Sequence, residues 1–145
     1  MMKNTFKKSL AISALGAGLT LTNTVQAELA IVVNPGYSGE KINIEEVRSL
    51  FQGKKRNLPN GARAKVVDQS SGSPARGKFL SEVLEQSEAD SNRYWSRQIF
   101  SGKTRPAVLD SAEAVKRWVA LTPQAIGYID IKDVDRSVKV ILRIN

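Results

Sequence analysis

The segment "DQSSGSPAR", residues 68–76, places hydroxyl, amide and guanidinium groups at the expected start of a helix. The first N–H groups of a helix lack intrahelical acceptors and lie at the positive end of the helix dipole, so they favour an oxyanion. Side-chain hydroxyls, amides and a guanidinium fork can add donors to such a site. The candidate anion-binding residues are Gln69, Ser70, Ser71, Gly72, Ser73 and Arg76.

A helix cap needs the same residue types without any ligand. Ser73 suits the N-cap, and Pro74 suits the first helical position, although its missing N–H also removes a donor from an anion site. Arg76 can instead pair with Asp68, with Glu82 or with another surface carboxylate. The residues alone therefore leave two interpretations open, an anion site and a capping turn.

Other kinds of chemistry find little support in the composition. The chain has neither cysteine nor histidine, which excludes disulfides, thiolate or imidazole metal sites, cysteine nucleophiles and Ser-His-Asp triads. It also lacks a D-x-D-x-D-G run and a pair of carboxylates with an acid-base role. We therefore predict no catalytic residue, no metal ligand and no cofactor, and we do not expect an enzyme.

Basic residues cluster around a predicted turn, in the set Lys54, Lys55, Arg56, Arg63 and Lys65. This set is either a rim that attracts anions or a partner, or a solvated loop. Basic residues are not interleaved with aromatic ones, so nucleic acid is not an expected partner.

Two further groups of residues have structural interpretations. Trp95 and Trp118 lie at core spacing on predicted helices, as does Tyr94, and core packing is the better interpretation of both tryptophans. The carboxylates near the last strand are interpreted as turn and surface residues, namely Asp130, Asp133 and Asp135.

The first 27 residues have the layout of a secretory signal peptide. Three lysines precede an apolar run over 10–25, and "VQA" ends at Ala27. The run is short and rich in Gly, Ser and Thr for a membrane span. We predict cleavage after Ala27 and a periplasmic location, with a retained anchor or a nearby cut as the alternatives. Residues 28–145 then form a single domain, whose net charge falls from +8 to +5 when the three lysines are lost.

Strands and helices are predicted to alternate along residues 28–145. Strands are expected at 29–34, 65–69, 124–130 and 138–144, and helices at 43–53, from 73 to about 84, at 88–100 and from 110 to about 121. Asn43, Ser87 and Asp110 are the expected helix caps, and 105–109 is expected to be a connecting segment. This alternation predicts an α/β domain with a mixed or mostly parallel sheet.

Four segments in this order carry a family resemblance: "EEVRSLFQGK", "VVDQSSGS", "YWSRQIFSGK" and "LTPQAIGYID". They resemble the second lobe of the phosphate-binding type II periplasmic solute-binding proteins of ABC transporters, and the chain looks like a short version of that family. The resemblance implies a single lobe with a sheet of about four to five strands flanked by helices. It also implies phosphate or a similar small anion as ligand and a transporter permease as partner.

The sequence departs from that family at the ligand. The family clamps phosphate between two lobes, and the first lobe has no counterpart here. Gly72 and Ser73 match the Gly-Ser of the family's Arg-x-x-Gly-Ser-Gly-Thr turn, but Gln69 replaces the arginine and Pro74 and Ala75 replace Gly-Thr. We therefore expect weak binding. The alternative function is an envelope interaction module that uses the lobe as a scaffold to bind another envelope protein or a second copy of the chain.

Overall fold

The computed structural model describes residues 16–20 and 28–145 of the chain. Most of the predicted signal peptide lies outside the described residues, as does the predicted cleavage site at Ala27, so both stay predictions. Within the described ranges, no helix has the length and apolar character needed to cross a membrane.

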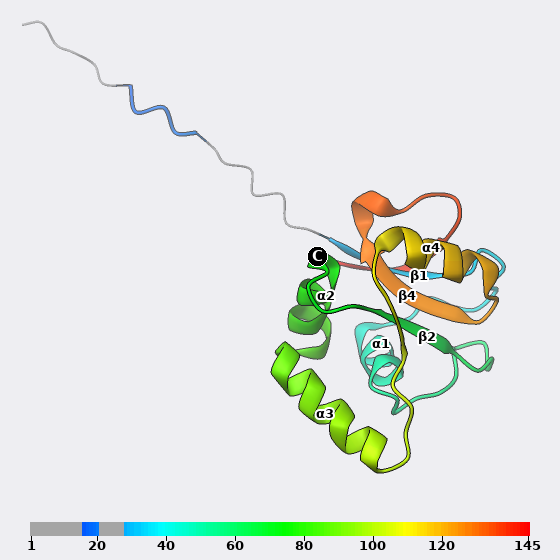
Figure 1. Ribbon diagram of the computed structural model, residues 1–145. Coiled ribbons are helices and arrows are strands. Elements are labelled where there is room, and N and C mark those ends of the chain that lie inside the picture. Colours follow the sequence, from blue (N-terminus) through cyan, green and yellow to red (C-terminus); the bar gives the residue numbers. More distant parts are fainter. Residues whose placement is uncertain (1–15, 21–27) are drawn as a thin grey trace, which may run out of the picture.

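A five-stranded mixed sheet forms the centre of the molecule (Figure 1). Its strands are β1 (Leu29–Val33), β2 (Lys65–Gln69), β3 (Ala107–Leu109), β4 (Ala125–Asp130) and β5 (Lys139–Ile144). They are arranged in the order β3-β2-β4-β1-β5. Strand β2 is parallel to both β3 and β4, whereas β1 is antiparallel to β4 and β5. The predicted fold class, a mixed α/β sheet of about five strands, is confirmed.

Helices cover both faces of this sheet. They are α1 (Ile44–Phe51), α2 (Pro74–Phe79), its π-helical continuation η1 (Leu80–Leu84), α3 (Glu88–Phe100), α4 (Ala112–Leu121) and the 3-10 turn η2 (Ile131–Asp133). Asn43 and Ser87 form the predicted capping boxes of α1 and α3. The predicted cap at Asp110 is wrong by one residue, because Ser111 provides the oxygen that accepts the Ala114 N–H at 3.1 Å.

The sequence predicted that 105–109 would be only a connecting segment, and this prediction is wrong. Residues 107–109 form the edge strand β3, which pairs in parallel with β2. Three residues are too few to show a strand periodicity, and Val108 is 45 % exposed at the sheet edge. The strand is therefore set by its pairing with β2 rather than by a local pattern.

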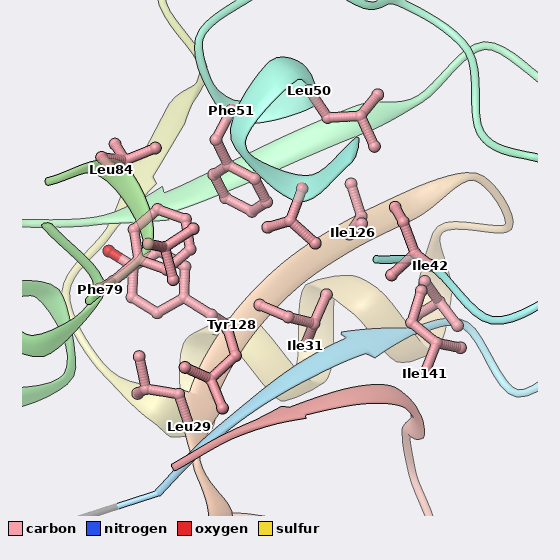
Figure 2. Close-up of a cluster of buried hydrophobic side chains, with 14 of the residues drawn as sticks. Leu29, Ile31, Ile42, Leu50, Phe51, Phe79, Leu84, Ile126, Tyr128 and Ile141 are labelled. Carbon is pink, nitrogen blue, oxygen red and sulfur yellow. The ribbon is translucent and has the colours of Figure 1, made fainter. Parts of the chain in front are cut away.

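The larger core lies between the sheet and α1, α2 and η1. Figure 2 shows Phe51 from α1 and Tyr128 from β4 beside Phe79. The Phe79 and Tyr128 rings stack with centroids 3.9 Å apart, and Phe51 lies 4.7 Å from Phe79. This aromatic cluster fixes α2 against β4, and α2 begins directly after the candidate anion-binding turn.

The opposite face of the sheet is covered by α4, where Val115 and Val119 pack on Val32 and Val67. Trp118 is half-buried against this second core, and Trp95 of α3 is buried with 3 % exposure. The prediction that the tryptophans pack in the interior is thus confirmed fully for Trp95 and in part for Trp118.

Candidate functional site

An open hollow of about 510 Å³ lies at the carboxyl ends of the three parallel strands. We call it the turn hollow, and it is lined by residues 69–75, 110–112, 130, 132 and 133. Ligands of open α/β sheets bind outside the carboxyl ends of parallel strands. Five of the six predicted site residues, all but Arg76, line this hollow.

The turn itself is held by backbone hydrogen bonds. Ser70 N donates to Leu109 O at 3.0 Å, and Ser73 N donates to Ser70 O at 3.1 Å. Gly72 has φ of +90°, a left-handed conformation that favours glycine. Ser73 is the N-cap of α2 and Pro74 its first residue, as the sequence predicted. The backbone N–H groups of Ser71, Gly72 and Ala75 do not take part in the bonds that fold the turn.

The side chains of Gln69 and Ser73 are bonded to one another. The Ser73 hydroxyl donates to Gln69 Oε1 at 2.5 Å, and Gln69 Nε2 donates to Tyr128 O at 2.7 Å. Ser73 makes no side-chain cap bond to the N–H groups of α2. An anion that accepted a hydrogen bond from the Ser73 hydroxyl would have to displace Gln69 Oε1 as the acceptor.

Arg76 lies in the interior, behind the turn. Its Nη1 donates to Asp68 Oδ2 at 2.7 Å, and its Nε and Nη2 donate to the two Glu88 oxygens at 2.6 and 3.1 Å. The side chain is 2 % exposed. Pairing with Asp68 was one alternative given by the sequence, and the second partner is Glu88 rather than Glu82. Arg76 can hold an anion only if this network opens.

The network continues to the turn and to the aromatic core. Asp68 Oδ1 accepts from Tyr128 Oη at 2.5 Å and from Gln69 N at 2.8 Å. Burial, and next to it the charge of Asp68, raises the pKa of Tyr128 well above its usual value. The hydrogen bonds from Arg76 lower the pKa of Glu88. Arg76 therefore positions the turn through Asp68 and Gln69.

The turn hollow also contains acidic groups that sequence reasoning did not place there. Asp110, Asp130 and Asp133 line it, and Lys132 is the one cation among its lining residues. Asp130 also has its predicted turn role, since it accepts from Lys132 N at 3.0 Å. Across residues 16–20 and 28–145 no three acidic side chains lie close enough to hold a metal ion. The acids thus make the hollow less favourable for an anion.

Comparison with known proteins gives matches in structure only. No protein-family model matches the sequence, and no curated protein matches it. A phosphate ABC transporter substrate-binding protein from Clostridium perfringens, solved with bound phosphate, matches with a TM-score of 0.64 and 21 % identity. An ABC-type phosphate transport receptor from Vibrio cholerae matches with 0.62 and 25 %, and PstS from Borrelia burgdorferi with 0.60 and 17 %.

These matches cover 79 % of this chain but only 45 %, 46 % and 47 % of the three solved chains. The chain thus spans about half the length of the proteins that it matches. Its fold corresponds to one lobe of phosphate ABC transporter substrate-binding proteins, as the sequence motifs indicated.

Proposed function

We propose that the protein is an exported solute-binding protein homologue whose turn hollow binds phosphate or a related tetrahedral oxyanion weakly. The observation that carries the proposal is the position of the hollow. It lies at the carboxyl ends of β2, β3 and β4, beside the unused N–H groups of Ser71, Gly72 and Ala75. The fold around it is shared with a protein that was solved with phosphate bound. Signal cleavage after Ala27, a periplasmic location and delivery to an ABC permease are parts of the same proposal.

The ligand would be held mainly by neutral donors. Ser70, Ser71 and the backbone of the turn line the hollow, whereas Arg76 acts as a positioning residue behind it. A one-sided hollow leaves its anion partly hydrated, and the three lining aspartates oppose it electrostatically. We therefore expect a dissociation constant of about 1 mM, which corresponds to about 4 kcal/mol of binding free energy.

Titration with inorganic phosphate or sulfate, followed by amide NMR, tests the proposal. Saturable shifts are expected at Ser71, Gly72 and Ala75 at constant ionic strength. The double variant Ser70→Ala/Ser71→Ala should weaken the titration severalfold, whereas Ser81→Ala, an exposed serine on η1, should not. If these three amides do not move at about 10 mM anion, well above the expected dissociation constant, the proposed ligand site is wrong.

The second candidate function is an envelope interaction module, and exposed apolar groups on α3 favour it. Phe100 is 95 % exposed and Ile99 is 52 % exposed at the end of that helix. Large exposed apolar side chains often mark a surface that another protein covers. Sedimentation of the wild type and of Phe100→Ser distinguishes the functions. A strictly monomeric protein that still binds phosphate would remove the homodimer version.

A further inference from the structure

A second hollow, of about 480 Å³, lies at the opposite end of β2 and β3. We call it the basic hollow. It is bordered by the amino ends of the two strands and lies between the loop after α1 and the segment that follows α3. Five of its lining residues are cationic and none is acidic: Lys55, Arg56, Arg63, Lys103 and Arg105.

The walls of the basic hollow are fixed by the fold. Ala64 N donates to Arg56 O at 2.8 Å, which closes the loop after α1, and Leu58 within that loop is 2 % exposed. From α3, the Tyr94 hydroxyl donates to Gln52 O at 2.7 Å, which ties the helix to the end of α1. Trp95 packs next to Gly53, so the two walls are held together from beneath. The backbone segments that carry the cations are therefore in place before any ligand arrives.

Most of these cations have no ion-pair partner among residues 16–20 and 28–145. Lys55 Nζ pairs with Glu46 Oε1 at 3.1 Å, but the other four cations form no salt bridge with any described residue. The Nε of Arg105 is buried and lacks a hydrogen-bond partner among the described residues. Glu88 is close enough for Arg105 to lower its pKa, after the larger effect of Arg76, but both of its oxygens already accept from Arg76. Most of this positive charge thus has no ion-pair partner within the part of the chain that the structure describes.

The size and surface of the hollow restrict the anion that would compensate this charge. Its volume lies in the range of small-molecule sites, about 300–1,000 Å³. A single phosphate would fill only a small part of it. The two largest apolar lining residues, Leu50 and Trp95, are only 2 % and 3 % exposed. The accessible apolar lining is therefore limited to the smaller residues Ala64, Val66, Pro106 and Ala107. A ligand composed mostly of charged groups fits these conditions, and guanidinium forks suit phosphate oxygens.

We propose that the basic hollow binds a small anion that carries at least two linked phosphate groups, at a site separate from the turn hollow. Arg56, Arg63 and Arg105 supply guanidinium forks, while Lys55 and Lys103 supply ammonium charges. Because most of these side chains are partly exposed, binding weakens as salt rises.

Calorimetric titration of the full chain with inorganic tripolyphosphate, orthophosphate and citrate at one ionic strength tests this proposal. We expect tripolyphosphate to bind one per chain and at least tenfold more tightly than orthophosphate or citrate. The double variant Arg63→Gln/Arg105→Gln should lose at least tenfold in tripolyphosphate affinity. The matched control Arg117→Gln/Arg136→Gln removes the same charge from exposed residues outside the hollow and should change affinity less than threefold.

Amide NMR of the wild type locates the bound tripolyphosphate without relying on a variant that folds correctly. Tripolyphosphate should shift Arg63, Lys103 and Thr104 and leave Ser71 and Gly72 unchanged. Shifts confined to Ser71 and Gly72 would overturn the second site while supporting the turn hollow. Equal affinity for citrate would overturn the assignment to phosphates, and an equal loss in the matched control would reduce the effect to nonspecific charge attraction.

Discussion

The two hollows at opposite ends of β2 differ in how their arginines are used. Behind the turn hollow, Arg76 is buried and bonded to Asp68 and Glu88, while three aspartates line the open space. The basic hollow has three arginines and two lysines, of which only Lys55 forms an ion pair with a described residue. The turn hollow therefore contains the turn that resembles the phosphate-binding family, but its walls are acidic. The basic hollow contains mostly unpaired cations, but no motif of that family.

This difference shows that an arginine close to a binding motif is not necessarily available to bind a ligand. A cation whose charge is already balanced by bonded carboxylates stabilises the fold, and an anion gains little from it. A cation without such partners remains available to a ligand. We expect Arg76 to belong to the first class and the arginines of the basic hollow to the second.

The largest effect is expected from Arg76→Met. Asp68 and Glu88 would lose their partner, and Asp68, whose side chain is 8 % exposed, would keep a nearly buried charge. Removing one member of a buried ion pair costs about 3–5 kcal/mol, so urea denaturation should show a loss of that size. Arg93→Met is the control, because Arg93 is 66 % exposed and pairs with Asp90 on the surface. It should lose less than about 1 kcal/mol. If both variants lost the same free energy of unfolding, the buried pairing of Arg76 would contribute no more to stability than a surface ion pair.

Local patterns predicted much of the fold. The boxes at Asn43 and Ser87, the proline at the start of α2 and the two long strands of "QAIGYID" and "VKVILRI" are all set by residues close in sequence. The sequence missed β3, whose three residues acquire strand structure through β2. The cap of α4 was placed one residue early because Asp110 and Ser111 are both good capping residues.

The candidate site was predictable only where it is continuous along the chain. Residues 69–73 line the turn hollow as one segment, but Asp110 and Asp130 reach it through the parallel pairing of β2 with β3 and β4. Likewise, the basic run around Arg63 was visible in the sequence. Lys103 and Arg105 lie about 40 residues further along the chain. They line the same hollow as Arg63 only because α3 packs against the end of α1. Long-range pairing of this kind leaves no local signal.

A smaller effect is expected from acidification, and Glu88 should account for part of it. Because Arg76 lowers the pKa of Glu88 below 4.5 in the folded protein, this carboxylate stabilises the fold above about pH 4.5. That contribution is lost as the pH falls through the lowered pKa. Glu88→Gln should therefore cost about 1 kcal/mol at pH 7, since the side chain is 38 % exposed, and the difference should shrink in acid.

Thermal unfolding between neutral pH and about pH 3 measures this effect, a range that includes the usual glutamate pKa. Glu82→Gln is the matched control, because Glu82 is an exposed glutamate on η1 and forms no salt bridge with the described residues. A constant difference between the wild type and Glu88→Gln at all pH values would contradict the role of the Arg76 pair.

A smaller change is expected in the phosphate affinity of the turn hollow when Asp110 is replaced in Asp110→Asn. The substitution removes one negative charge from the lining and should tighten phosphate binding about two- to fivefold at low salt, since a charge at about 7 Å in water contributes roughly 0.6 kcal/mol per ligand charge. Phosphate titration by amide NMR measures it. Glu40→Gln removes an exposed charge that lines neither hollow and should leave the affinity unchanged. Unchanged affinity in Asp110→Asn would place the anion elsewhere.

The smallest expected effect is that of Arg63→Gln on stability, and it tests directly whether Arg63, unlike Arg76, is unpaired in the fold. Arg63→Gln relieves repulsion among the five cations of the basic hollow, so at low salt it should raise the free energy of unfolding, by up to about 0.5 kcal/mol. The gain should disappear at about 0.5 M salt, where the screening length falls to roughly 4 Å. Arg117→Gln, on the exposed side of α4, should show a smaller change. Urea denaturation at both salt concentrations measures the difference. A loss of stability in Arg63→Gln would mean that this cation, like Arg76, already has a partner within the fold, and the contrast between the two hollows would then fail.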